Sequence, residues 1–447
     1  MAHTSTSNHM RAKRSFLRDV MPILTGRIAV QIASFITGII IARVLGVEGK
    51  GLIAAVILAP QMIITIAEFG VRNAAAFHIG RETWPVEKIV ETTLATAFLT
   101  SLIGMALCFG WLWLTWEDGY TPLIAIFACL VVPGAIVYTY IAGIFLGLQR
   151  IDEFTVSNWA PGITKLFGTA FFVGALGFGT AGAVGAMTLS VLLVAAIMLS
   201  NLSLFVPLRV RFTPEIARKM TGIGSSFAIV YFMMVMVYKA NIFLVQQFGS
   251  IEQLGFYSLS SNLAELLWQI PAVMSALVFA RSAAAKDEAK FSLKVAMLAR
   301  LTFLIGMIGA VIAALLARTV IPLIYGEAFA PSADIFVVLL PGVVAMVVFK
   351  ILRQDLSGRG TPWAASWIIV PMLASTIGLG ALFIPTYGAM GAAISMSSVY
   401  VIGTLGFIIL YARVTHLPLK DLVLYRKSDF TTFKDAFTRL VNKRRKT

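Results

Sequence analysis

The sequence predicts an all-α polytopic membrane protein, with about twelve transmembrane helices in two parallel six-helix bundles around a central cavity. Hydrophobic residues make up 59% of the 447 residues and charged residues 13%, and the mean hydropathy is +0.88. Apolar runs of about 20 residues, enough to cross a bilayer core of roughly 30 Å, recur along the chain. One phrase occurs twice, as "TAGAVGA" at 180–186 and "TYGAMGA" at 386–392. This composition excludes an ordinary soluble domain.

Apolar runs, read against the Gly, Pro and charged residues that break them, place six spans in each half of the chain. The first six predicted spans are 21–45, 52–78, 89–114, 121–147, 155–177 and 181–206. The second six are 223–247, 255–279, 294–317, 332–355, 362–384 and 388–412. The first span follows a polar and basic segment, so we expect it to act as an uncleaved signal anchor.

Basic residues indicate the orientation. They gather before the first span, between the two halves and at the C-terminus, whereas the loops on the other side carry only Arg43, Lys50 and Arg318. The positive-inside rule therefore predicts that both termini lie in the cytoplasm. The predicted segments are an N-terminal tail (1–20), a first bundle (21–208), a basic linker (209–222), a second bundle (223–412) and a basic tail (413–447).

The two halves match at several further places. "VVPG" (131–134) corresponds to "LLPG" (339–342), and Pro161 corresponds to Pro371, at nearly constant offsets. Close packing by small residues is the alternative explanation of such matches. Six spans return the chain to its starting side, so the pattern favours two parallel repeats with the same outer hinge, as in transporters that rock two bundles around a central site.

Five basic residues fall within the predicted spans, where a cation is costly unless it faces water or a partner. Lys165 is about ten residues into its span, roughly 15 Å deep at 1.5 Å per residue, which is too deep for snorkelling. Arg27, Arg72 and Lys350 lie a turn or two from the cytoplasmic end, where snorkelling is the alternative. Lys239 lies nearer the outer surface.

The acidic residues within the spans are fewer. Glu265 is predicted near mid-depth, and Glu68 lies one helical turn from Arg72, which it can neutralise. The interior therefore leans positive and favours an anionic, diphosphate-bearing substrate. We expect Lys165 to bind it, with Arg27, Arg72 and Lys239 along the same path and Glu265 and Glu68 as coupling or pairing carboxylates. A permanent Lys165–Glu265 strut is the alternative.

Four segments carry a resemblance to a known family. They are "ARVLGVEGKGLIAA", "IPLIYGEAFAPSADIFVVLLPG", "LSGRGTP" and "IPTYGAMGAAIS". The chain resembles the polysaccharide transporter family, whose superfamily also holds multidrug-and-toxin exporters and peptidoglycan-precursor flippases. The resemblance implies that superfamily's fold. It also implies movement of an undecaprenyl-diphosphate-linked oligosaccharide to the outer leaflet for O-antigen, capsule or exopolysaccharide synthesis. A glycan polymerase or chain-length machinery is the implied partner, and a monomer is expected.

Other classes of protein are less well supported by the sequence. A cation-coupled multidrug exporter is the main alternative, but its cavity carboxylates are scarce here. The longest outer loop has about 14 residues (318–331), and neither an Asp-x-Asp pair nor a GxxxxGK[ST] phosphate loop occurs, so no enzyme is predicted. The four histidines lack metal-ligand spacing. We therefore predict no metal site, no cofactor and no nucleic-acid partner.

Overall fold

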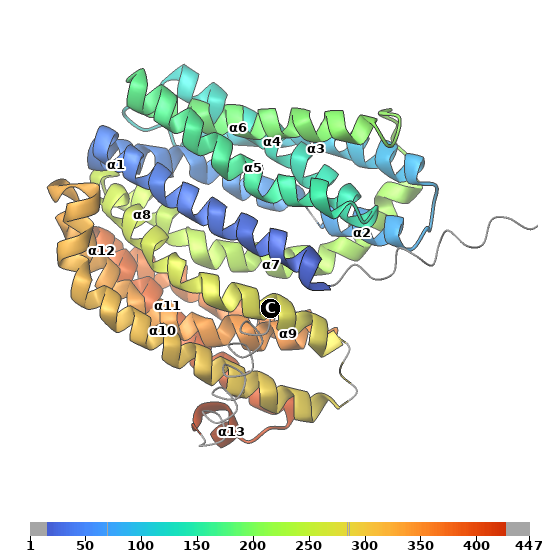
Figure 1. Ribbon diagram of the computed structural model, residues 1–447. Coiled ribbons are helices and arrows are strands. Elements are labelled where there is room, and N and C mark those ends of the chain that lie inside the picture. Colours follow the sequence, from blue (N-terminus) through green and yellow to red (C-terminus); the bar gives the residue numbers. More distant parts are fainter. Residues whose placement is uncertain (1–15, 69, 284, 286, 426–447) are drawn as a thin grey trace, which may run out of the picture. The chain divides into compact units, whose positions relative to one another are not determined.

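The computed structural model describes residues 16–68, 70–283, 285 and 287–425, and these are mainly helical (Figure 1). The all-α class predicted from the sequence is confirmed for this part of the chain. The helices of the first half are α1 (Phe16–Glu68), α2 (Val71–Gly80), α3 (Val86–Leu114), α4 (Pro122–Gly147), α5 (Ile151–Thr169), the π-helix η1 (Ala170–Ala175) and α6 (Gly179–Ser203).

The second half continues the same all-helical pattern. Its elements are α7 (Pro214–Phe248), α8 (Ile251–Glu265), η2 (Leu266–Trp268), α9 (Gln269–Ala283), α10 (Glu288–Tyr325), η3 (Glu327–Phe329), α11 (Ala330–Gly358), η4 (Pro362–Ala365), α12 (Ser366–Thr415) and α13 (Leu419–Val423). Among the described residues, eight segments are long and apolar enough to cross a membrane. Two of them, around α1 and α12, each contain two predicted spans, so the count of twelve stays a prediction.

The chain divides into two compact units, Met1–Ile229 and Val230–Thr447, which we call the N-unit and the C-unit. The division lies inside α7 and not in the predicted linker 209–222. The irregular segment between the halves is 204–213, because Pro214 begins α7 and Ala217 N–H already donates to the carbonyl of Thr213. Proline suits this first helical position, since its missing N–H would have no helical partner there.

In the N-unit, α4 is the central helix and packs against α1, α2, α3, α5 and α6. Thr121 caps its N-terminus by accepting a hydrogen bond from Ile124 N–H (3.3 Å). The first predicted span and most of the second lie in α1, where Gly46 breaks the helix with a positive φ of 68°. The predicted span 52–78 is not continuous, because Gly70 adopts the left-handed conformation (φ 69°) before α2 begins. Glycine accepts such backbone angles without a Cβ clash.

In the C-unit, α11 takes the central place and packs against α8, α9, α10 and α12. The predicted span 255–279 is again interrupted, here by the tighter 3₁₀ turn Leu266–Trp268 between α8 and α9. Short 3₁₀ stretches within a helical run re-aim the side chains around them. In this unit the turn carries Trp268 shortly after Glu265, and both belong to the candidate site.

The repeated Pro-Gly step gives the two central helices the same contact. A Cβ built on Gly134 of α4 would lie 2.8 Å from Val191 Cγ2 of α6, and one on Gly342 of α11 would lie 2.6 Å from the Cα of Ser397 of α12. Gly134 and Gly342 are 208 positions apart, and Val191 and Ser397 are 206 apart. Equivalent glycines thus contact equivalent helices, which supports internal duplication over chance packing.

The sequence suggested that the repeated small-residue phrase forms the same turn in both units. The structure shows different turns. Its first copy lies inside α6, and the chain turns just before it, at Gly177 (φ 67°) and Gly179 (φ 58°). Its second copy contains the turn, at Gly388 (φ 56°, ψ −131°) within α12. Both copies pack closely against backbone, because a Cβ on Gly182 would lie 3.1 Å from the carbonyl oxygen of Phe172 and one on Gly391 would lie closer still to that of Phe383.

Candidate functional site

In the N-unit, α5 holds Lys165 half-buried between α1 and α6. The helix is fixed one turn earlier, where the Ser190 hydroxyl of α6 donates to the carbonyl of Pro161 (2.7 Å) and also contacts the Thr164 hydroxyl (2.8 Å). Gly162 packs against Val30 of α1. Because this face of α5 is held on both sides, Lys165 projects from a fixed stretch of helix.

Lys50, which the sequence placed in an outer loop, is buried in the N-unit with 8% of its surface exposed. It follows the break at Gly46, and its ammonium group feels the positive charge of Lys165. Within the described part of this unit, neither lysine forms an ion pair. Lys50 and Lys165 are therefore two neighbouring cations without a counter-charge among the described residues, and sequence reasoning assigned only Lys165 to the interior. In the sequence, only the position of Lys50 shortly after Gly46, where the first helix breaks, could have indicated that this lysine turns back into the unit.

Of the other N-unit residues predicted for the site, the structure describes the side chain of one, Arg72. Arg72 is half-buried on α2, and its guanidinium carbon lies 5.6 Å from the centroid of the Phe154 ring of α5. The backbones of Arg27 and Glu68 belong to α1, but their side chains lie outside the described residues. The Arg72–Glu68 pair therefore stays a prediction, whereas the Arg72–Phe154 contact is a cation–π arrangement.

In the C-unit, Lys239 and Glu265 form an ion pair, with 3.7 Å between Nζ and Oε1. Lys239 comes from α7 and Glu265 from the end of α8, and each side chain keeps a fifth to a third of its surface exposed. The sequence named both residues but did not pair them with each other. Lys165 belongs to the other unit, so its proposed contact with Glu265 stays a prediction.

Lys350 of α11 is the C-unit residue that sequence reasoning undervalued. Its Nζ lies 3.8 Å from the centroid of the Trp268 ring and 4.6 Å from that of Tyr238, instead of being free to snorkel. The ring of Tyr400 lies about equally far from both, at centroid distances of 6.0 and 6.1 Å. Trp268 is fixed by a hydrogen bond from its Nε1 to the carbonyl of Val343 (2.9 Å). We call these three rings the aromatic cage; Lys350 lies over two of them, Trp268 and Tyr238, and Tyr400 packs against both.

Arg353 adds a third cation one turn beyond Lys350. Its Nε is buried and has no hydrogen-bond partner among the described residues, and its charge acts on the nearby Tyr238. Glu265 acts electrostatically on Lys350 as well as pairing with Lys239. This cluster therefore sets three cations, Lys239, Lys350 and Arg353, against the single carboxylate of Glu265.

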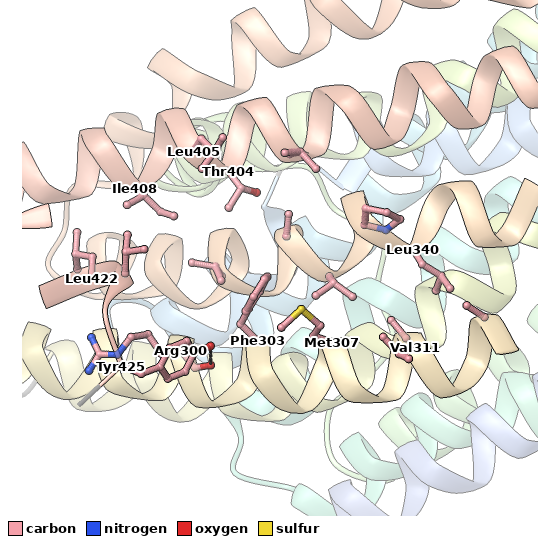
Figure 2. A pocket seen from close by; sticks show the side chains of 18 of the residues that line it. Arg300, Phe303, Met307, Val311, Leu340, Thr404, Leu405, Ile408, Leu422 and Tyr425 are labelled. Atoms are coloured by element: carbon pink, nitrogen blue, oxygen red, sulfur yellow. Dashed lines mark hydrogen bonds between the residues drawn. The ribbon is translucent and has the colours of Figure 1, made fainter. Parts of the chain in front are cut away.

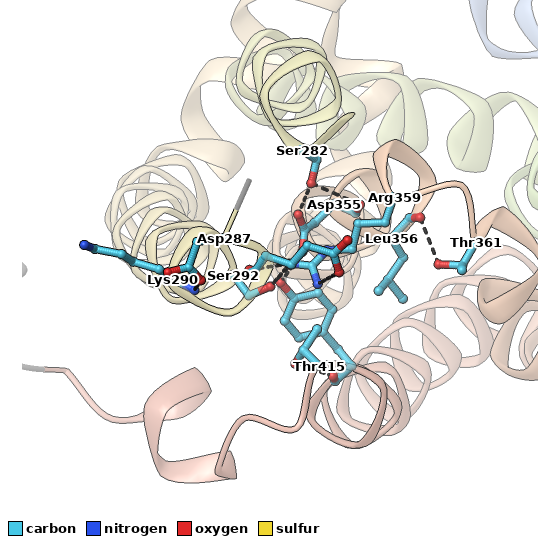
Figure 3. A network of polar contacts seen from close by, with 11 residues as sticks. Ser282, Asp287, Lys290, Ser292, Asp355, Leu356, Arg359, Thr361 and Thr415 are labelled. Atoms are coloured by element: carbon cyan, nitrogen blue, oxygen red, sulfur yellow. Dashed lines mark hydrogen bonds and ion pairs between the residues drawn. The ribbon is translucent and has the colours of Figure 1, made fainter. Parts of the chain in front are cut away.

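A second polar cluster in the C-unit has a different character (Figure 3). The buried carboxylate of Asp355 accepts hydrogen bonds from Ser282, Ser292 and Tyr411, the last at 2.6 Å, and pairs with Arg359 at 3.0 Å. Ser282, Ser292 and Tyr411 belong to α9, α10 and α12, and Arg359 directly follows α11 as its C-cap. Since every side of the carboxylate is occupied, this cluster holds four helices together and leaves no room for a ligand.

Two helical units with equivalent glycine contacts, and eight segments of the described chain that are long and apolar enough to cross a membrane, define a polytopic membrane protein. The model of the family described as "Polysaccharide biosynthesis protein" matches residues 16–280, more than half of the chain. The chain belongs to this family, as its sequence motifs predicted.

Individual relatives agree with this assignment. A protein of Shigella flexneri named "Putative O-antigen transporter" is 24% identical over 405 residues, covering 84% of this chain and 92% of that protein. The solved structure "Lipid II flippase MurJ, inward closed conformation" has a TM-score of 0.70 at 14% identity, covering 91% of this chain and 89% of that chain.

The solved structure "Inward-facing conformation of a multidrug resistance MATE family transporter of the MOP superfamily" has a TM-score of 0.71 at 15% identity. The match covers 89% of this chain and 98% of that chain. At such identities the likeness concerns the fold, and it confirms the predicted fold class of a polytopic membrane protein.

Proposed function

We propose that this protein is a flippase that moves an undecaprenyl-diphosphate-linked oligosaccharide from the cytoplasmic to the outer leaflet of the bacterial inner membrane. Membership of a polysaccharide biosynthesis family and the similarity to the Shigella flexneri protein named "Putative O-antigen transporter" support this activity. The observation that carries the substrate class is the cation excess within the apolar helices. Lys239, Lys350 and Arg353 face one carboxylate in the C-unit, and Lys50 and Lys165 pair with none in the described part of theirs.

The diphosphate is the part of the substrate that these cations suit. A cation among apolar helices costs about 2.5–3.5 kcal/mol on insertion scales, so a protein that retains several needs an anion to bind there. Ammonium and guanidinium groups bind phosphate oxygens through charge-assisted hydrogen bonds. The sugar is free to vary, because the charged linkage is common to lipid-linked glycans.

The Lys239–Glu265 pair suggests how binding is coupled to movement. An arriving diphosphate competes with Glu265 for Lys239, and it gains more in a state where Glu265 has moved away. A ligand shifts a conformational equilibrium only by its difference in affinity for the two states. The pair supplies such a difference, which alternating access requires.

The remaining parts of the proposal concern topology and partners. Both termini and the basic segment 204–213 lie in the cytoplasm, since positive charge is retained there. The flippase acts as a monomer without a cofactor and catalyses no covalent reaction. A glycan polymerase or chain-length machinery receives the cargo on the outer leaflet.

One observation favours a cation-coupled multidrug exporter as the second candidate. The aromatic cage of Trp268, Tyr238 and Tyr400 is the kind of surface that binds organic cations. Here, however, Lys350 already occupies the faces of Trp268 and Tyr238. A cationic drug would have to displace it and would meet Arg353 beside it, so we rank this candidate second.

Deletion of the gene in a strain without a second flippase tests the proposal. Lipid-linked repeat units should accumulate on the cytoplasmic leaflet while surface polysaccharide is lost. Complementation with the intact chain is the control. Normal surface glycan in the deletion strain would reject the flippase, and a changed drug-resistance profile with normal glycan would support the exporter.

A further inference from the structure

The chain that joins α6 to α7 has two chemically different sides (Figure 1). From residue 207 to residue 213 it contains no helix, turn or bend, so it runs extended. In an extended chain, successive side chains point to opposite sides. Apolar and basic residues alternate here, as Leu208, Arg209, Val210, Arg211 and Phe212. This extended segment, 207–213, therefore has an apolar side and a basic side.

The apolar side of the extended segment is uncovered. Leu208, Val210 and Phe212 expose 40%, 68% and 50% of their surface. Exposed apolar residues are expected where a helix faces lipid, but this segment lies between two membrane-crossing candidates, Gly179–Ser203 and Ile229–Phe248, and belongs to neither. Adjacent large apolar side chains that remain exposed outside a span indicate contact with a membrane or a partner.

The backbone limits how deep the extended segment can lie. Between Pro207 and Phe212, neither the N–H groups nor the carbonyl groups form a hydrogen bond with the residues that the structure describes. Backbone groups without hydrogen bonds are not tolerated in lipid hydrocarbon. The segment therefore suits the headgroup layer, where the backbone finds polar partners and apolar side chains reach the acyl boundary.

The basic side of the extended segment has no counter-charge. Arg209, Arg211 and the nearby Arg218 of α7 are exposed, and none of them forms an ion pair within the described part of the chain. The segment and the first turns of α7 hold one carboxylate, Glu215, which already pairs with Lys219 at 3.3 Å. Guanidinium groups bind phosphate oxygens through charge-assisted hydrogen bonds. The basic side thus suits the phosphates of an anionic lipid surface.

Two other arginines show the contrast, because both are engaged within the protein. Arg300, at the α13 end of the apolar cavity between α10, α11 and α12, donates to the carbonyl of Asp421 (Figure 2). Arg150 lies beside the start of the connection, with its guanidinium carbon 4.0 Å from the centroid of the Phe205 ring. That contact holds the connection at α6 and leaves Arg209 to a ligand outside the described chain.

We propose that the extended segment is an interfacial anchor that binds the headgroups of anionic phospholipids at the end of α6. Its apolar side chains lie at the acyl boundary, and Arg209 and Arg211 bind lipid phosphates. Zwitterionic lipids would satisfy the apolar side equally well, so the arginines are the source of the anionic preference. Because α7 continues from the N-unit into the C-unit, the anchor fixes the depth of the connection between the units. The proposal goes beyond transport and does not depend on the cargo.

Lipid quenching tests the anchor in the purified full chain, with its two cysteines replaced by serine, in phospholipid nanodiscs. A bimane label on Val210→Cys should be quenched by lipids with brominated acyl chains, because this side chain lies at the acyl boundary. At equal mole fraction, brominated phosphatidylglycerol should quench it more strongly than brominated phosphatidylcholine. High salt should weaken this preference, because it screens exposed charges.

Removal of the arginine charges tests the source of the preference. Arg209→Gln together with Arg211→Gln should abolish most of it, since each basic residue at an anionic surface changes binding by about fivefold. Lys290→Gln together with Arg413→Gln is the control, because it removes two exposed charges from the C-unit. This control variant should keep the preference for phosphatidylglycerol.

A label that neither lipid quenches would overturn the anchor, because the segment would then lie in water or under protein. Equal quenching by the two lipids would overturn the anionic ligand, and so would a preference that survives in the double arginine variant. If that variant does not fold, Arg209→Gln and Arg211→Gln are compared singly with Lys290→Gln. Each should lose part of the preference, and no loss from either would overturn the proposal.

Discussion

The ammonium group of Lys350 lies 3.8 Å from the centroid of the Trp268 ring, on the face of an indole whose Nε1 is bonded to the carbonyl of Val343. The contact places a cation from the central helix of the C-unit against a ring from the 3₁₀ turn after α8. Glu265 ends α8 immediately before this turn, so one short segment presents both the ring and the carboxylate. The lysine is thereby held in position near Glu265, whose charge acts on it.

Loss of the Lys350 charge should impair transport more than folding. Lys350→Met keeps the length of the side chain and removes the cation–π contact, worth about 2 kcal/mol when desolvated. We expect flipping of lipid-linked glycan to fall at least about tenfold, with Lys350→Arg partly active. Lys290→Met, at an exposed position on α10, is the control. Wild-type transport by Lys350→Met would show that the cage is structural only.

Loss of the Asp355 charge should lower stability, in contrast to loss of the Lys350 charge, which should mainly lower transport. Asp355→Asn leaves Arg359 without its buried counter-charge, and breaking a buried pair costs about 3–5 kcal/mol. The thermal unfolding temperature in detergent should therefore fall markedly. Asp334→Asn removes the exposed Arg318–Asp334 pair and should have almost no effect, because exposed pairs contribute about 0–1 kcal/mol. Equal stability of the two variants would contradict a holding role for Asp355.

The repeated glycine contact predicts matched defects in both units. Gly342→Ala and Gly134→Ala each push a methyl group into a neighbouring helix, and overpacking costs about 1–3 kcal/mol. We expect lower thermal stability and yield for both variants. Gly378→Ala in α12 is the control, since a Cβ there meets nothing within 4 Å. If only one of the two variants were destabilised, the two glycine contacts would not be equivalent in energy, and this prediction would be wrong.

The predicted topology can be tested by impermeant-thiol labelling in a chain lacking Cys108 and Cys129. Cysteine at Gly119 or Tyr387 should be labelled from outside the cell, and cysteine at Arg150 or Lys290 should be protected until the membrane is permeabilised. Arg150, Tyr387 and Lys290 have exposed surface, so protection at either basic position would not reflect burial. The reverse labelling pattern would invert the orientation and remove the basis for a cytoplasmic segment 204–213.

The features that could be predicted from the sequence depend on residues that are close together in the chain. Apolar runs and basic flanks are local, and so are the paired Pro-Gly steps, which turned out to make equivalent contacts in α4 and α11. Breaks such as Gly70 and the turn at Leu266–Trp268 were missed, because glycine within an apolar run does not reveal its backbone angle. The aromatic cage was also missed, since Tyr238, Trp268 and Tyr400 lie far apart in the chain and only packing brings the three rings together, with two of them against Lys350.

The last prediction is that Lys165 binds the substrate and is not a fixed strut. Glu265 already has a partner in its own unit, Lys239 at 3.7 Å, whereas Lys165 lies near a second cation, Lys50. Two neighbouring cations are a better match for the two charges of a diphosphate than for the single charge of a carboxylate. Lys165→Glu should therefore abolish transport while the protein still reaches the membrane at normal levels. Lys88→Glu, at an exposed position on α3 of the same unit, should transport normally.

Swapping the charges separates binding from a strut. Adding Glu265→Lys to Lys165→Glu should not restore transport, because the swapped carboxylate would repel the phosphate and the new lysine would face Lys239. Lys50→Met should lower transport in the same direction as Lys165→Met, each by removing one of the two charges. Full rescue by the swapped pair would establish the strut instead. Wild-type transport by Lys165→Ala would exclude both roles, because neither a bound phosphate nor a strut survives the loss of the ammonium group.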